Sequence, residues 1–193
     1  MPAWRLLSGL AIPYVTLLDL DLGRNHAGWG RIRYAAKQLL AFPAIDSNLS
    51  TEQIDAIPAW DDPSDPRAAE AGQKWITFLE SSGVFFSTPL DLDYSMLLNF
   101  PGAFEVEAAE LEPPDSGTLR AVLGKSSGWV GAYDAAEQSY FGPYASRFRS
   151  KSKPAAHLAA LSVLNDTELG TGTPESLGRL LEAVAARLAD LPE

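Results

Sequence analysis

The sequence predicts an α/β fold, in which a parallel sheet is flanked by helices and is followed by a mostly helical C-terminal region. Two short β-rich runs at residues 14–18 and 84–86 are nearly continuous in apolar character, which is typical of strands buried in a parallel sheet. The segments between and after these runs have apolar residues at helical spacing. The chain has 193 residues, 46% hydrophobic and 21% charged, so it can bury a sizeable core and global disorder is not expected.

The first third of the chain predicts a helix, a strand and a second helix. The apolar set in residues 4–10 is compatible with a short helix, and residues 14–18 form the first expected strand. An acidic loop follows the strand, and a helix is expected over residues 32–40, ended by Pro43. Residues 43–66 are rich in proline, aspartate and serine and predict an irregular connection with one short helix near residues 52–57.

A second strand and its flanking helices are expected next. Residues 67–82 predict a helix with Trp75, Phe78 and Leu79 facing inward and Gly83 at its end. The strand at residues 84–86 leads into another acidic loop, and a further helix is expected to begin at residues 94–98.

The remainder of the chain divides into an irregular region and a helical one. Residues 101–135 are rich in glycine, proline, serine and glutamate and are expected to form a surface insertion or loop region. Helices are expected beyond that region, at residues 136–141, 144–148, 153–164 and 174–191. The predicted organisation is therefore a partial α/β core over residues 1–100, the insertion over 101–135, and a helical region over 136–193 that completes the site.

Composition excludes several classes of protein. The absence of cysteine rules out disulfide scaffolds, thiol nucleophiles and thiolate metal sites, and two histidines are too few for a histidine-rich metal cage. No apolar run reaches the length of a membrane span, so we expect a cytoplasmic protein with no membrane partner. The net charge of −10 argues against non-specific binding of nucleic acid by the whole surface, but it suits carboxylates that bind a metal.

Two Asp-Leu-Asp segments carry the candidate chemistry. Asp19 and Asp21 follow the first expected strand, and Asp91 and Asp93 follow the second. If each segment is extended, both carboxylates of a pair point to the same face, where a hard cation such as Mg²⁺ or Mn²⁺ would relieve their repulsion. Two converging pairs could hold two metals that clamp a phosphodiester bond during cleavage. A lone aspartate at a strand end also serves as a turn former or a helix N-cap, and this second interpretation stays open for each pair.

Basic residues form local exceptions in the acidic chain. Arg147, Arg149, Lys151 and Lys153 lie close together, and Arg24, Arg31 and Arg33 follow the first acidic pair. Such groups can contact phosphate, although a short basic run is as often a solvated turn. His157 is expected to be a packing or surface residue rather than a ligand.

These motifs together resemble a known family. The run from Tyr14 to Arg24, with Gly28-Trp29-Gly30-Arg31-Ile32, resembles the Asp-x-Asp strand of the Toprim domain in the OLD-family (overcoming lysogenisation defect) ATP-dependent endonucleases. Residues 83–93 and 152–157 are similar to the downstream acidic motif and the lysine motif of the same nucleases, so the resemblance spans about residues 10–165.

The resemblance implies a partial Toprim-like sheet and metal-dependent cleavage of DNA. Asp19, Asp21, Asp91 and Asp93 would bind Mg²⁺ or Mn²⁺, and Lys153 would be the catalytic lysine, acting with Asp19 and Asp91. The family also uses a glutamate on an earlier strand and an ATPase region, whereas residues 1–18 contain no acidic residue and the chain has no Walker-type phosphate loop. We therefore expect the C-terminal part of such an enzyme, which uses ATP only through an ATPase region or subunit outside this chain. A homo-oligomer is a further expectation.

Two other functions remain open at this point. The chain could be a non-catalytic or split subunit that binds and completes an ATPase and nuclease partner, because an unpaired strand edge favours association. Alternatively, the Asp-x-Asp chemistry could serve a phosphatase or phosphotransferase that acts on small phosphates.

Overall fold

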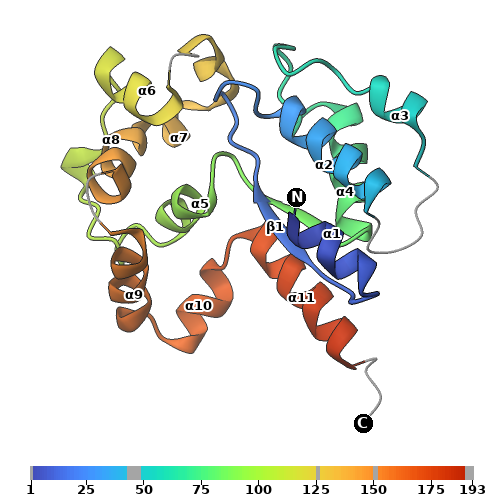
Figure 1. The fold of residues 1–193 in the computed structure, drawn as a ribbon. Helices are drawn as coiled ribbons and strands as arrows, with labels where there is room; N and C mark the ends of the chain where they lie inside the picture. The colour runs from blue at the N-terminus through green and yellow to red at the C-terminus, as the bar shows by residue number, and fades with distance from the viewer. Residues whose placement is uncertain (1, 43–48, 125–126, 150–151, 190–193) are drawn as a thin grey trace. The chain divides into compact units, whose positions relative to one another are not determined.

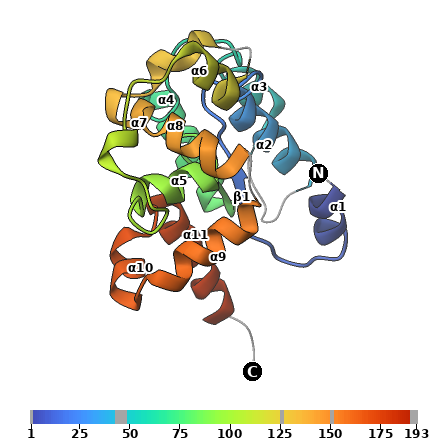
Figure 2. The ribbon, with the colours of Figure 1, turned by 90° about the vertical axis from the view of Figure 1, so that its left-hand side faces the viewer.

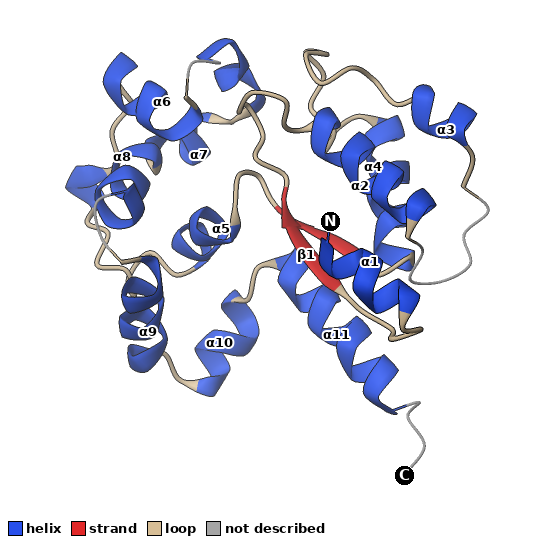
Figure 3. Ribbon diagram, in the orientation of Figure 1, coloured by secondary structure: helices blue, strands red, loops and turns tan. Residues whose placement is uncertain are grey.

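Two parallel strands, β1 (Thr16–Asp19) and β2 (Val84–Ser87), form the sheet of the protein (Figure 3). The computed structural model describes residues 2–42, 49–124, 127–149 and 152–189. Thr16 pairs with Val84 and Asp19 with Ser87, so the two strands end at the same level. The predicted strands and their parallel pairing are confirmed, and the fold is α/β with mostly helical content.

The chain divides into two compact units. Unit 1 comprises Met1–Leu20, His26–Ser87 and Glu175–Glu193, and unit 2 comprises Asp21–Asn25 and Thr88–Pro174. This division by contacts differs from the predicted regions, because the C-terminal residues rejoin the N-terminal ones in unit 1.

Unit 1 places the sheet among helices (Figure 1). Its helices are α1 (Pro2–Gly9), α2 (Trp29–Ala41), α3 (Thr51–Asp55), α4 (Glu70–Ser81) and α11 (Glu175–Ala189). Both α4 and α11 contact β2, and α2 packs on α3 and α4. All four residues of β2 are buried, whereas β1 is half-buried and its last residue is exposed. The expectation that the first strand is buried on both faces is therefore wrong for β1, which within the described residues pairs with β2 alone.

The core of unit 1 explains why the apolar patterns of the sequence form these elements. Ile32, Ala35, Ala36 and Leu39 recur at helical spacing on α2 and are all fully buried. Leu79 of α4 and the β2 residues Val84 and Phe86 belong to the same cluster; the expected inward residues Trp75 and Phe78 are partly buried against it. The predicted end of α2 at Pro43 lies outside the described residues, and α2 ends at Ala41.

Unit 2 is helical (Figure 2). It contains α5 (Leu92–Asn99), α6 (Ser116–Leu123), α7 (Ala135–Ser139), α8 (Phe141–Tyr144), α9 (Lys153–Val163) and α10 (Asp166–Gly172). Short 3-10 helices lie at η1 (Ala108–Glu110) and η2 (Ser127–Ala132), and α8 continues as a π-helical turn, η3 (Ala145–Arg149). Among the described residues, no helix combines the length and the hydropathy that a bilayer crossing requires.

Aromatic side chains fill the interior of unit 2. Tyr94 of α5 lies against Phe141 and Tyr144 of α8, with ring centroids 5.7 and 5.5 Å apart. Residues 101–135, expected to form a surface insertion or loop region, contribute α6 and four buried side chains to this unit: Phe104, Val122, Leu123 and Tyr133. The segment therefore forms part of the interior that supports the acidic residues.

Candidate functional site

Main-chain hydrogen bonds join the residues after β1 to the residues after β2 within unit 2. In unit 2, the Asp21 amide donates to the Leu90 carbonyl at 2.6 Å, and the Leu22 amide donates to the Pro89 carbonyl at 3.0 Å. These bonds come directly after the ends of β1 and β2, so main-chain pairing continues beyond the last residues of the sheet. Within unit 2, the backbone of residues 21 and 22 therefore lies beside that of residues 89 and 90, next to Asp91.

Asp19 ends β1 in unit 1 and is exposed. Its Oδ1 accepts a hydrogen bond of 2.8 Å from the hydroxyl of Ser87, its register partner at the end of β2. The carboxylate is therefore presented at the carboxyl end of a parallel strand, which is where open α/β sheets bind ligands.

Asp21 does not share a strand face with Asp19, contrary to the expectation from their spacing. The strand ends at Asp19, and Asp21 has a φ of +54°, which takes the chain out of the extended conformation. Asp21 belongs to unit 2, is only 4% exposed and forms an ion pair with Arg24.

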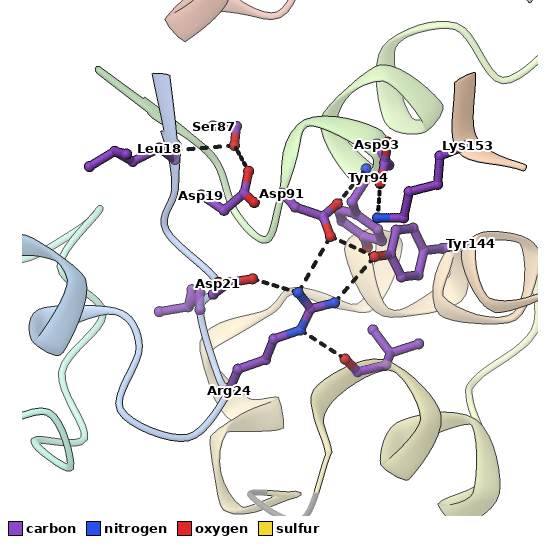
Figure 4. A network of polar contacts seen from close by, with 12 residues as sticks. Leu18, Asp19, Asp21, Arg24, Ser87, Asp91, Asp93, Tyr94, Tyr144 and Lys153 are labelled. Atoms are coloured by element: carbon purple, nitrogen blue, oxygen red, sulfur yellow. Dashed lines mark hydrogen bonds and ion pairs between the residues drawn. The ribbon is translucent and has the colours of Figure 1, made fainter. Parts of the chain in front are cut away.

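Arg24 connects the two acidic segments in the interior of unit 2 (Figure 4). Its Nη1 lies 2.5 Å from Asp21 Oδ1 and 3.4 Å from Asp91 Oδ2. The Nη2 atom donates to the Tyr144 hydroxyl at 3.2 Å, and Nε donates to the Val122 carbonyl at 3.0 Å. One guanidinium thus neutralises two carboxylates that come from distant parts of the sequence.

Tyr144 completes this network. Its hydroxyl donates to Asp91 Oδ2 at 2.6 Å while it accepts from Arg24. Burial and the neighbouring Asp91 carboxylate raise the pKa of Tyr144, so the side chain remains a neutral donor. Burial on its own lowers the pKa of Arg24, but its interactions with Tyr144, Asp21 and Asp91 outweigh burial and raise that pKa overall.

Asp91 and Asp93 lie at the start of α5 rather than on an extended segment. Asp91 is the N-cap of α5, and its Oδ1 accepts a hydrogen bond of 3.0 Å from the Tyr94 amide. Helix α5 begins two residues earlier than expected, so Asp93 falls in its first turn. The expectation of two carboxylates on one extended face is wrong here too, and the N-cap interpretation is correct for Asp91.

Asp93 instead holds two side chains of α9. Lys153 Nζ donates to Asp93 Oδ2, and His157 Nε2 lies 2.7 Å from Asp93 Oδ1. Burial on its own raises the pKa of Asp93, but the bonds from His157 and Lys153 outweigh burial and lower that pKa overall. The ion pair with Asp93 holds the Lys153 ammonium in place, and the Lys153 side chain is 48% exposed.

His157 packs as the sequence predicts. Its ring lies 5.6 Å from the ring of Phe104 and 5.4 Å from that of Phe148, measured between centroids. These contacts and the bond to Asp93 fix the position of α9 beside α5 within unit 2.

The other basic residues of the expected cluster do not act together. Arg147 donates to both carboxylate oxygens of Glu110 at 2.8 and 2.9 Å and to the Phe104 carbonyl at 2.7 Å, so it ties η3 to η1. Arg149 is exposed, and Lys151 lies outside the described residues.

The donor set at Asp21 and Asp91 suits a hard cation. The two carboxylates converge on one positive charge, the guanidinium of Arg24. Mg²⁺ commonly binds through only one or two carboxylates and keeps several waters, so two aspartates are a sufficient protein contribution. Here the charge is the Arg24 guanidinium, and within the described residues no group of three or more acidic or histidine side chains lies close enough to hold a metal.

Sequence reasoning did not find the roles of three residues of the site. Tyr144 and Ser87 carry no recognisable motif, and Arg24 is visible only as a basic residue near an acidic pair. Their roles follow from contacts across 120 residues (Arg24 to Tyr144) and 68 residues (Asp19 to Ser87).

The chain was also compared with known proteins. No family model matches it, and neither the curated proteins nor the solved structures give a match.

Proposed function

We propose that this chain is the acid- and lysine-bearing part of a metal-dependent DNA endonuclease of the OLD/Toprim type. The observation that carries the proposal is that Asp21 and Asp91, from the two Asp-Leu-Asp segments, bind the same cationic group. The parallel pairing of β1 and β2 supports it, because both acidic segments then leave the sheet at one edge.

The side chains have distinct roles in this proposal. Asp21 and Asp91 would hold Mg²⁺ or Mn²⁺, which when bound supplies a Lewis acid and an activated water for phosphodiester hydrolysis. Lys153 would donate to a phosphate oxygen, and Asp93 would position Lys153 through their ion pair. The resemblance also assigns a metal-binding role to Asp19, which is exposed at the end of β1. ATP would act only through an ATPase region or subunit.

The test is nicking of supercoiled plasmid DNA by the purified chain with Mg²⁺ or Mn²⁺. We expect nicking to fall at least about tenfold in Asp19→Asn and in Lys153→Ala. Lys74→Ala is the matched control, because Lys74 forms an ion pair of the same kind with Glu70 on an exposed helix face. Equal activity in all three variants would refute the assigned roles.

Metal binding gives a second, independent measurement. Free Mn²⁺ has a six-line electron paramagnetic resonance signal that falls when protein binds the ion. We expect Asp21→Asn to weaken this binding, and a chain that neither nicks DNA nor binds Mn²⁺ through Asp21 would refute the proposal.

A second candidate is a non-catalytic or split subunit that completes a partner. The observation that favours it is the two-stranded sheet, whose half-buried β1 has one neighbour among the described residues. Two parallel strands rarely stand alone, and a partner strand could add to β1. Carboxylate-dependent Mn²⁺ binding without nicking, together with co-purification of an ATPase, would select this candidate.

A further inference from the structure

A second polar site lies in unit 1, on the N-terminal half of α2. It is a pocket of about 370 Å³, and its lining includes two arginines and three aromatic rings: His26, Gly30, Arg31, Arg33, Tyr34 and Trp60. A volume near 400 Å³ falls at the lower end of the range for small-ligand sites, about 300–1,000 Å³. The pocket is therefore large enough for one small ligand but not for a duplex.

Two aromatic rings form one wall of the pocket. The ring centroids of His26 and Trp60 lie 4.4 Å apart, with an angle of 47° between the ring planes. Gly30 allows this arrangement, because a Cβ atom at that position would lie only 3.0 Å from the Cβ of Trp60. Trp60 is half-buried and lines the pocket.

The charged residues that line the pocket are positive. Arg31 is exposed, and Arg33 is held by its Nη2 atom, which donates to the carbonyls of Asp55 and Ile57. The Nε atom of Arg33 is buried and has no hydrogen-bond partner among the described residues. Because this Nε atom is buried, Arg33 contributes positive charge to the lining of the pocket rather than a hydrogen bond from Nε. In a chain of net charge −10, this pocket offers a local site for an anion.

We propose that this pocket binds one nucleotide unit, with the base stacked on Trp60 and the phosphate held by Arg31 and Arg33. Bases of every kind stack on aromatic side chains, and the guanidinium group matches the geometry of phosphate oxygens. A ligand that had only a flat ring or only an anionic group would leave half of the pocket unused. The nucleotide belongs either to a DNA strand or to a free mononucleotide. Binding of a DNA strand in this pocket rests on the proposed function, whereas binding of a nucleotide as such does not.

The test measures fluorescence anisotropy of a short fluorescein-labelled oligothymidylate with the whole chain in EDTA, so that metal-dependent cleavage cannot occur. We expect Trp60→Leu to raise Kd at least about fivefold, which corresponds to the lower end (~1 kcal/mol) of a base–aromatic stack. Arg31→Gln is expected to raise Kd and to reduce the dependence of log Kd on log salt by about one. Lys37→Gln, an exposed charge on the same helix that does not line the pocket, is the matched control and should bind as the wild type does.

Competition distinguishes the sources of the ligand. Displacement of the oligonucleotide by thymidine monophosphate at similar nucleotide concentrations supports a mononucleotide site, and displacement only by unlabelled oligonucleotide supports a strand. Equal displacement by inorganic phosphate alone would refute the stacking role. Unchanged Kd in both Arg31→Gln and Trp60→Leu would overturn the proposal, and because Arg31 is exposed, Arg31→Gln tests it even if Trp60→Leu fails to fold.

The outcomes are separable from those of the nuclease assay. Binding that depends on Trp60 and Arg31, in a chain that never nicks DNA, retains the pocket and refutes the nuclease. Nicking that depends on Asp19 and Lys153, with no effect of the pocket variants on Kd, retains the nuclease and refutes the pocket.

Discussion

The hydroxyl of Tyr144 donates a 2.6 Å hydrogen bond to Asp91, which makes a tyrosine of α8 a direct partner of the second acidic segment. The same hydroxyl accepts from Arg24, so it links the carboxylate to the guanidinium that neutralises it. Asp91 is also the N-cap of α5, so the same carboxylate caps a helix and takes part in the ion-pair network of the site.

Tyr144→Phe is expected to lower the free energy of unfolding by about 1–3 kcal/mol, because it leaves buried polar partners without a hydrogen bond. Urea unfolding of the two proteins measures the difference. Tyr140→Phe, at a half-buried tyrosine in the same unit, is the control and should cost less. Equal losses in both variants would contradict the assigned role of the Tyr144 hydroxyl.

Arg24→Met is expected to destabilise the fold by about 3 kcal/mol at neutral pH, since it leaves Asp21 and Asp91 without their cation. Added Mn²⁺ should then raise the unfolding midpoint of this variant more than that of the wild type, because a ligand bound only by the folded state stabilises it. Arg179→Met, which removes an arginine paired with Glu80 in unit 1, is the control and should gain no such response. Equal Mn²⁺ shifts in wild type and Arg24→Met would show that the ion does not bind between Asp21 and Asp91.

Glu110 predicts a stability change at acidic pH. The hydrogen bonds from Arg147 and from the Glu107 amide lower the pKa of Glu110 from 4.5 to about 2. Because the folded pKa is the lower one, the stabilisation is fully present above pH 4.5 and is lost as the pH falls through 2.

Glu110→Gln should therefore destabilise the protein at pH 6, by less than about 1 kcal/mol for so exposed a pair, and should have no effect near pH 2. Unfolding free energies over this pH range give the profile. Glu112→Gln, at an exposed neighbouring position, is the control. A difference between wild type and Glu110→Gln that does not change with pH would contradict the ion pair.

Two glycines of α10 should respond to alanine in opposite directions. A Cβ at Gly172 would lie 2.9 Å from Phe100 Cζ and closer still to Cε1, whereas nothing lies within 4 Å of a Cβ at Gly170. Gly172→Ala is expected to destabilise the fold by about 1–3 kcal/mol through overpacking. Gly170→Ala should stabilise it by about 0.4–1 kcal/mol, because alanine restricts the unfolded chain. Thermal unfolding compares the two, and stabilisation by both would show that α10 does not pack on Phe100.

The sequence was informative where a pattern is local. Alternating or continuous apolar residues located both strands, and helical periodicity located α2, α4 and α11 to within three residues. Helix α10 was not predicted, although Asn165 and Glu168 form the capping box that signals its start. An N-cap signal at Asp91, directly before an apolar run, could likewise have placed the start of α5.

The partners of the charged residues could not be predicted from one sequence. The spacing of Asp19 and Asp21 suggests a common face only while the strand continues, and the positive φ of Asp21 ends it. Whether a carboxylate meets a metal, an arginine or a lysine depends on contacts between distant segments. Sequence spacing contains no information about such contacts between Arg24 and Asp91 or between Asp93 and Lys153.

Unit 1 is built from separated segments of the chain, and this has a consequence for synthesis on the ribosome. Helix α11, which is made after both strands, contacts β1 and β2, and Arg187 donates to the Tyr14 carbonyl at 2.5 Å. The two strands therefore emerge long before the helix that shields them, and residues 88–174 of unit 2 are made in between. During that interval the apolar residues of β2 lack part of their cover, so nascent chains that stall before residue 175 are expected to be the form most prone to aggregate.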